Sequence, residues 1–268
     1  MATIISDLSS PELIPALETN MTEFFSNWGR ATGRELYIGK DYIRVLTGIP
    51  FPVLNGVFRA QLTPETIDDA ISDTLAALKT WKVPLFWWVG PSTKPSDLGK
   101  HLEQQGFHHA GNMTEMVIDL SILKEDGPQP HNFIIRPVEN DEALVTWVHT
   151  AGTGFDIPTS IHELIIDLER SVGVNSDVLH RYIGYQNGVP VASSAIFIHS
   201  GVAGIYMVST LPEARRQGIG TAMTRIPLID ARLKGYRVGT LQAMEMGYPV
   251  YKKLGFQDVY SISMYLAG

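Results

Sequence analysis

The stretch from Val208 to Thr221 constrains this chain more than any other part of it. It reads Val-Ser-Thr-Leu-Pro-Glu-Ala-Arg-Arg-Gln-Gly-Ile-Gly-Thr. The apolar, β-branched run at 204–210 predicts a buried strand, and the helical spacing of apolar residues up to Gly235 predicts a helix that ends there. A basic, glycine-containing turn at a helix start suits an anion such as a pyrophosphate, because the N–H groups and the helix dipole favour negative charge.

The spacing of the two glycines in this turn differs from that of the better-known phosphate loops. A dinucleotide-binding fingerprint needs a third small residue three positions after Gly220, where Met223 stands. A nucleoside-triphosphate loop needs Gly-Lys-Ser/Thr, which the sequence does not contain. The alternative interpretation is an ordinary strand–turn–helix in which Arg215 and Arg216 are solvated.

Two motifs resemble those of the GCN5-related N-acetyltransferase (GNAT) superfamily. Arg215-x-x-Gly218-x-Gly220, after a strand and Pro212, is similar to its motif A. About thirty residues further on, the segment 247–256, Gly-Tyr-Pro-Val-Tyr-Lys-Lys-Leu-Gly-Phe, is similar to its second signature, a short helix that carries Tyr and ends in Gly-Phe. The resemblance covers residues 132–268. It implies an acyl-CoA N-acyltransferase fold of the α/β (α+β) class, with a mixed, largely antiparallel central sheet flanked by helices.

The resemblance also implies acetyl-CoA as the co-substrate. The motif strand would splay from its neighbour and contact the pantetheine, and an amide near Val208 would polarise the thioester carbonyl. The pyrophosphate would rest on N–H groups of the loop, with charge-assisted bonds from the two arginines. The residues so implied are Val208, Ser209, Thr210, Arg215, Arg216, Gln217, Gly218, Ile219, Gly220 and Thr221.

Tyr251 is the candidate general acid, because members of the family often place a Tyr here to protonate the departing thiolate. Packing against the cofactor is its alternative role. The general base is harder to assign, since residues 204–210 contain no carboxylate. Glu245 is the nearest candidate, with Asp156 and Glu163 as others, and each is also explained as a solvated surface carboxylate. No metal is expected, because the chain has no cysteine and His162-Glu163 lacks the second His of a zinc helix.

The resemblance therefore implies an N-acetyltransferase that moves an acetyl group to a primary amine of a small molecule or peptide by direct attack. The missing carboxylate in the motif strand leaves an alternative open, a non-catalytic acyl-CoA-binding or regulatory protein. Trp81, Trp87 and Trp88 are expected to build the core of the first half, and lining a cleft for an aromatic or apolar substrate is their alternative role.

The two halves of the chain repeat the same pattern. Gly106-Phe107 and Gly255-Phe256 both end a helical segment and precede an apolar strand, at an offset of 149 residues. The first half has Leu102 in place of Tyr251, and Gln-Leu-Thr-Pro-Glu-Thr at 61–66 in place of the glycine loop. We therefore expect two tandem copies: a degenerate GNAT-like domain at 1–123, a Pro- and Gly-rich linker at 124–131 and a catalytic domain at 132–268.

Composition sets broader limits. The 268 residues are 44% hydrophobic and 18% charged, which is typical of a globular protein. A net charge of −7 argues against non-specific nucleic-acid binding. The N-terminus lacks the features of a signal peptide, and the most apolar run, residues 83–89, is too short to span a membrane. We expect a cytoplasmic monomer or homodimer that binds neither nucleic acid nor membranes.

Overall fold

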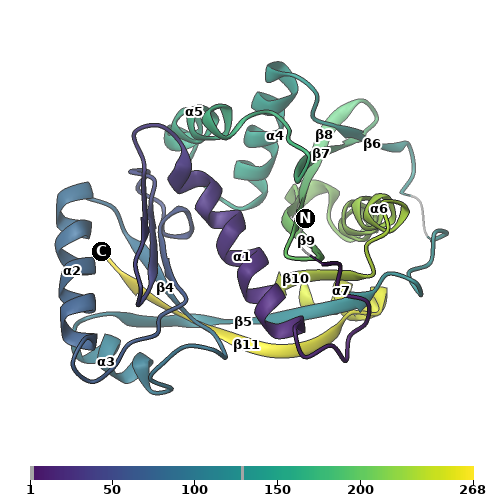
Figure 1. Ribbon diagram of the computed structural model, residues 1–268. Coiled ribbons are helices and arrows are strands. Elements are labelled where there is room, and N and C mark those ends of the chain that lie inside the picture. Colours follow the sequence, from purple (N-terminus) through teal and green to yellow (C-terminus); the bar gives the residue numbers. More distant parts are fainter. Residues whose placement is uncertain (1–2, 128–129) are drawn as a thin grey trace. The chain divides into compact units, whose positions relative to one another are not determined.

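The computed structural model describes residues 3–127 and 130–268 (Figure 1). The chain divides into two compact units, each made of two segments that are separate in the sequence. Unit 1 comprises Met1–Met21 and Glu115–Val259, and unit 2 comprises Thr22–Thr114 and Tyr260–Gly268. The domain boundaries predicted at residues 123 and 132 stay a prediction, and residues 128–129 of the expected linker lie outside the described residues.

Unit 1 contains a sheet with the strand order β5-β10-β9-β8-β7-β6. The β6–β7, β7–β8 and β8–β9 pairs are antiparallel, whereas β9 and β10 are parallel. The strands are the later part of β5 (His108–Asp119), β6 (Phe133–Pro137), β7 (Leu179–Gln186), β8 (Val189–His199), β9 (Val202–Thr210) and β10 (Val238–Ala243). The helices are α4 (Asp141–Gly154), α5 (His162–Val172), α6 (Ile219–Leu233) and α7 (Tyr248–Leu254), with 3-10 turns η2 (Thr159–Ile161) and η3 (Pro212–Ala214).

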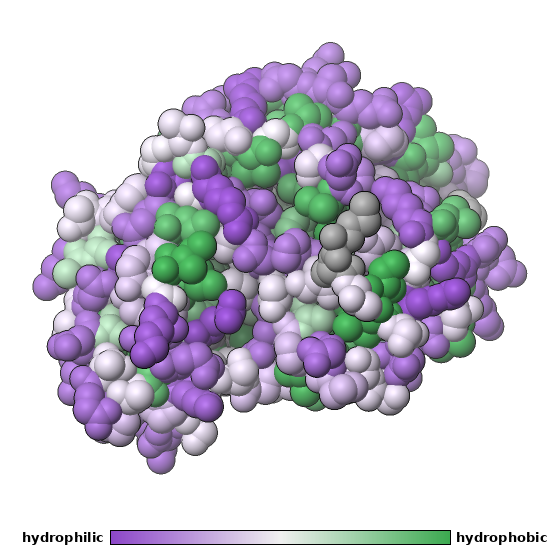
Figure 2. Space-filling view, viewed as in Figure 1, coloured by the Kyte–Doolittle hydropathy of each residue, from purple (hydrophilic) through white to green (hydrophobic). Residues whose placement is uncertain are grey.

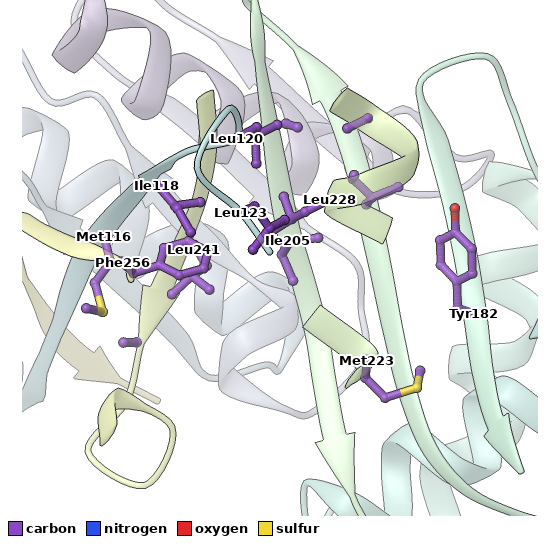
Figure 3. Packing of buried hydrophobic residues seen from close by; sticks show 14 of the residues in the cluster. Met116, Ile118, Leu120, Leu123, Tyr182, Ile205, Met223, Leu228, Leu241 and Phe256 are labelled. Atoms are coloured by element: carbon purple, nitrogen blue, oxygen red, sulfur yellow. The ribbon is translucent and has the colours of Figure 1, made fainter. Parts of the chain in front are cut away.

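The two faces of this sheet carry different helices. On one face, α6 and α7 cover an apolar cluster to which β5, β8, β9 and β10 contribute, and Figure 3 shows Ile118, Leu241 and Phe256 side by side in it. On the other face, the Trp147 indole of α4 donates to the Ser194 carbonyl at 3.0 Å. The first part of α1 (Leu13–Arg30) is held there through Asn20, whose amide donates to the carbonyls of Phe197 and His199.

Unit 2 repeats the arrangement on a smaller scale, with the strand order β1-β2-β3-β4-β11. The β3–β4 pair is parallel and the other pairs are antiparallel. Its elements are β1 (Glu35–Ile38), β2 (Ile43–Leu46), η1 (Pro52–Leu54), β3 (Gly56–Phe58), α2 (Ile67–Trp81), β4 (Leu85–Val89), α3 (Leu98–Gln104) and the later part of β11 (Gln257–Ala267). Trp87 and Trp88 are buried in this unit and Trp81 packs against its apolar cluster, as predicted.

The end of α3 and the end of α7 have the same backbone structure. Phe107 N donates to Leu102 O, and Phe256 N donates to Tyr251 O, each at 3.0 Å. The glycine before each phenylalanine is left-handed, with φ +92° at Gly106 and +100° at Gly255. Both phenylalanines are buried. The predicted offset of 149 residues therefore corresponds to a repeated helix end, in which only glycine fits without strain.

Most predicted elements form where the sequence places them, and the mixed, largely antiparallel sheet flanked by helices is confirmed. The hairpin over Asn187-Gly188 has φ +50° and +80° at these residues, as a type I′ turn requires. The apolar stretch 51–58 is a strand only in its last part. Its first part is η1, because Pro52 favours a turn start and the buried Asn55 side chain donates to the carbonyls of Ile49 and Phe51.

On the face seen in Figure 2, apolar residues form separate patches among hydrophilic ones. No helix in the described part of the chain has both the length and the apolar character needed to cross a membrane.

Candidate active site

The motif strand β9 parts from β10 midway along its length. The two strands pair only at Ala203–Gly239 and Gly204–Thr240, although β9 continues to Thr210. On its other edge, β9 stays paired with β8 up to Thr210. Residues 205–210 therefore present one backbone edge with no strand pairing in the described part of the chain. Such an edge can take the amide groups of a pantetheine chain.

A β-bulge lies in this parted segment. The register between β8 and β9 shifts so that Met207 and Val208 together face Ser194. Met207 has φ +52°, a left-handed conformation that costs a residue with a side chain about 1–2 kcal/mol. The Ser193 hydroxyl donates to the Met207 carbonyl oxygen at 2.8 Å and lies 2.8 Å from the Ser209 hydroxyl. A hydrogen bond of this kind contributes about 1 kcal/mol, which offsets much of the cost.

The bulge turns one peptide group out of the sheet plane. Ser209 lies on the face of the sheet that α4 covers, because a Cβ added to Gly154 of α4 would come within 2.6 Å of the Ser209 Cβ. Ser193 is the hydrogen-bond partner of Ser209 and lies on the same face, so its bond to the Met207 carbonyl draws that carbonyl toward this face. The Met207–Val208 peptide is trans, so its N–H points the opposite way. The Val208 N–H is thus directed at the α6–α7 face, where Val208 and Tyr251 pack against the same cluster.

The loop after β9 leads into the start of α6. Gly218 is the N-cap of α6 with φ +83°, no side chain caps this turn among the described residues, and its first turn has no acidic residue. Ala222 N is the first amide to reach an acceptor of this helix, Gly218 O at 3.1 Å. The amides of Ile219–Thr221 precede it and have no intrahelical acceptor. A Cβ on Gly218 would meet nothing within 4 Å, so the approach to these amides is open.

The two arginines predicted as phosphate ligands differ in their contacts. The Arg215 guanidinium donates to Thr210 O at 2.9 Å and to Gly154 O at 3.3 Å, which ties the loop to β9 and α4. Arg216 is exposed with φ +62°. Gln217 accepts from the Gln186 amide at 2.8 Å. Arg215 therefore shapes the loop, and Arg216 is the cation presented to solvent.

Tyr251 lies on α7 in a largely apolar setting. Its ring centroid is 5.9 Å from that of Phe256, and a Cβ on Gly247 would lie 2.9 Å from the ring. Burial raises the pKa of the Tyr251 phenol to about 12. The phenol therefore keeps its proton at neutral pH and can donate a hydrogen bond.

The carboxylates named from the sequence as bases are all exposed. Glu245 lies between Met244 and Met246, whose side chains are 54% and 73% exposed, on the loop that leads into α7. Asp156, with φ +55°, and Glu163 are exposed near α5. Of these, Glu245 is the one on the segment that carries Tyr251.

One buried carboxyl group, that of Glu115, was not predicted from the sequence. Glu115 on β5 is fully buried and accepts hydrogen bonds from the Thr240 hydroxyl and, at 2.8 Å, from the Gln242 amide. Burial raises the pKa of the Glu115 carboxyl to about 7, and the nearby Glu18 adds to the rise. The polar alternation of Thr240 and Gln242 in an otherwise apolar strand is the signal that could have indicated a buried polar partner.

Parted strands, an outward-turned amide and an open helix start define a site that can hold an extended, phosphate-bearing acyl carrier. Residues 178–258 match the family model for the acetyltransferase (GNAT) domain. The resemblance to GNAT acetyltransferases is confirmed over this range.

Solved structures share the fold over nearly the whole chain. A GCN5-related N-acetyltransferase from Kribbella flavida has a TM-score of 0.69 at 17% identity, covering 94% of this chain and 96% of that one. One from Sphaerobacter thermophilus has a TM-score of 0.58 at 14% identity, covering 100% and 95%. A tandem GNAT protein from the clavulanic acid biosynthesis pathway has a TM-score of 0.61 at 14% identity, covering 100% and 98%. At these identities the likeness concerns the fold. The sequence has no significant match among curated proteins.

Proposed function

We propose that this protein transfers an acetyl group from acetyl-CoA to a primary amine of a small molecule or peptide by direct attack. The observation that carries the proposal is the combination of the parted edge of β9 with the uncapped start of α6 at the end of the same strand. The edge fits the pantetheine, and the helix start fits the pyrophosphate. Both features lie within the GNAT domain match.

The residues have separate roles in the proposed reaction. The amides of Gln217 to Thr221 and the Arg216 guanidinium bind the pyrophosphate, while the Val208 N–H donates to the thioester oxygen. The amine nitrogen forms a C–N bond with the acyl carbon, and the C–S bond breaks. The thiolate that leaves has a pKa of about 8.5, well below that of the phenol at about 12. Tyr251 therefore stabilises the thiolate mainly as a hydrogen-bond donor.

The amine must lose a proton before it attacks, because its ammonium form has a pKa of about 10. Two carboxyl groups compete for this role. Glu245 is accessible to an incoming ammonium, whereas the buried Glu115 has the pKa that suits a base near neutral pH. Glu245→Gln and Glu115→Gln separate them. Only the variant that has lost the base shifts the acid limb of kcat/KM toward higher pH.

Acetyl-CoA binding comes first in the test, by thermal melting of the wild type and Arg216→Glu with and without acetyl-CoA. A panel of amines such as spermidine, glucosamine, 2-phenylethylamine and a lysine-containing peptide is then assayed for CoA release. Stabilisation of the wild type with CoA release from at least one amine supports the enzyme. Stabilisation without release from any amine would indicate the alternative, an acyl-CoA-binding or regulatory protein. No stabilisation would refute both.

A further inference from the structure

The position of Ser193 gives it a role in the proposed reaction that its sequence context does not suggest. It lies in the middle of β8, outside both GNAT motifs, and is fully buried. Its hydroxyl is the donor to Met207 O, at 2.8 Å. The carbonyl that it holds and the Val208 N–H belong to one planar trans peptide, so fixing one end fixes the other.

We infer that Ser193 is a positioning residue that aims the Val208 amide at the thioester oxygen of acetyl-CoA. This inference rests on the proposed function and concerns the same site. The Met207 backbone is left-handed, which a residue with a side chain rarely adopts unless its surroundings hold it there. The Ser193 hydrogen bond is a restraint of this kind, and it acts on the peptide that carries the donor.

Two further contacts restrain the same region of the sheet. The Ser209 hydroxyl lies 2.8 Å from the Ser193 hydroxyl, and Gly154 packs closely against Ser209. The buried Trp147 donates to the carbonyl of Ser194, the residue that faces the bulge. The α4 face thus provides a rigid support, and the amide donor is turned toward the opposite face. A donor held in place before the reaction polarises a carbonyl without further reorganisation.

The neighbouring serine provides a matched control. Ser194 is also fully buried, but its side chain lies on the other face of the strand and its hydroxyl has no hydrogen-bond partner among the described residues. Ser194→Ala removes the same atom from the next position in β8. It leaves the Met207 carbonyl and its donor unchanged.

The experiment measures the carbonyl stretch of bound acetyl-CoA that is ¹³C-labelled at the thioester carbonyl, by isotope-edited infrared difference spectroscopy. A hydrogen bond to the oxygen lowers this frequency on binding. Wild type and Ser194→Ala are expected to show the downshift, and Ser193→Ala is expected to lose most of it while acetyl-CoA still raises its Tm. With an amine that is a substrate, Ser193→Ala should lower kcat by about tenfold or more and leave KM for acetyl-CoA nearly unchanged.

Ser193→Cys keeps the size of the side chain and is used if the alanine variant does not fold. Its thiol is a weak donor, so most of the downshift should again be lost. A full downshift in a folded Ser193 variant, or an equal loss in Ser194→Ala, would overturn the inference and leave the proposed function intact. Failure of acetyl-CoA to raise the Tm of the wild type would instead overturn the proposed function, and the inference with it.

Discussion

The helix starts of α6 in unit 1 and α2 in unit 2 both follow the first strand of a parallel pair, yet their first turns are built in opposite ways. The α6 turn begins at a left-handed glycine and leaves its first amides without an acceptor inside the helix. In α2, the amides of Thr66 and Ile67 donate to Thr63 O at 3.0 and 3.1 Å. Asp68 and Asp69 also lie in its first turn.

The consequence is a difference in what each helix can bind. At α2 the preceding turn satisfies the Ile67 amide, and two carboxylates lie where the helix dipole favours negative charge. At α6 the same positive end is left for a ligand. A phosphate-binding helix start therefore needs the absence of internal partners as much as the presence of glycine.

A second difference concerns the strands. The offset of 149 residues relates Glu115 on β5 to Met264 on β11. Met264 is buried opposite Trp88 of β4. Glu115 instead lies with Thr240 and Gln242. Unit 2 has an apolar side chain at this position, whereas unit 1 has a carboxyl group whose pKa burial raises to about 7.

The largest expected effect tests the first comparison. Gly218→Asp places a carboxylate at the helix start and a side chain at φ +83°, so acetyl-CoA should no longer bind. At a thousandfold excess over the dissociation constant, acetyl-CoA stabilises the wild type by about 4.1 kcal/mol, and the variant should lose all of this in thermal melting. Thr66→Asp, at the N-cap of α2, is the control and should keep the full shift. An unchanged shift in Gly218→Asp would mean that the ligand lies elsewhere.

The next effect concerns Glu115 and the pH dependence of stability. Its pKa is about 7 in the folded state against an ordinary value of 4.5, so the folded state holds the proton more tightly. The free energy of unfolding should therefore fall by about 3 kcal/mol as pH rises from 4 to 8. Urea unfolding of wild type and Glu115→Gln at several pH values isolates this contribution as their difference.

Charged and titratable groups around Glu115 are common to both proteins, so they largely cancel in that difference. They include Glu18 and Tyr206. The pKa of the Tyr206 phenol is raised well above its ordinary value by burial and by the nearby Glu115. Glu115→Met, which copies the residue at the related position of β11, should show the same pH dependence as Glu115→Gln in this window. Parallel curves for wild type and Glu115→Gln would show that the carboxyl is not held protonated.

Tyr251→Phe should lower kcat by about tenfold, which is less than the effect of removing a general acid. The reason is that a phenol with a pKa of about 12 transfers its proton poorly to a thiolate and acts mainly as a hydrogen-bond donor. The ratio of wild-type to variant kcat should stay constant from about pH 6 to 10, since the phenol remains protonated throughout. The assay is CoA release with the fastest amine of the panel.

Tyr248→Phe on the same helix is the matched control. Its ring packs against the same apolar cluster, but its hydroxyl is exposed and donates to Asp258 at 2.7 Å, so loss of this hydroxyl should leave kcat unchanged. Equal effects of the two variants would argue that α7 is merely destabilised. The comparison with unit 2 adds that Leu102, at the position related to Tyr251, is fully buried and offers no hydroxyl.

The sequence predicted those features whose cause is local. The start of α6 after the glycine turn and the repeated Gly-Phe helix ends depend on residues a few positions apart, and both form as expected. Glu115 could not be found in this way. Its burial and its partner Thr240 depend on two strands separated by more than a hundred residues.

Ser193 was missed for the same reason, because its partner Met207 lies on the next strand and the left-handed backbone there has no glycine to mark it. The site residues inferred from the GNAT resemblance stay predictions. The structure places Val208, Gly218 and Tyr251 in unit 1, with surroundings that suit their expected roles.

The smallest effect tests whether the two units share one design. Gly106→Ala and Gly255→Ala each force a Cβ into a left-handed helix end, which should cost about 1 kcal/mol of stability. A Cβ would meet nothing within 4 Å at Gly106 and only Ile118 Cδ1 at 3.7 Å at Gly255, so backbone strain is the common cause. The shift in urea midpoint should be similar for both, and smaller for the asparagine variants, which tolerate this conformation better. A loss confined to Gly255→Ala would mean that the two sets of hydrogen bonds do not contribute equally to stability, and that unit 2 differs from unit 1 in its backbone as well as in its chemistry.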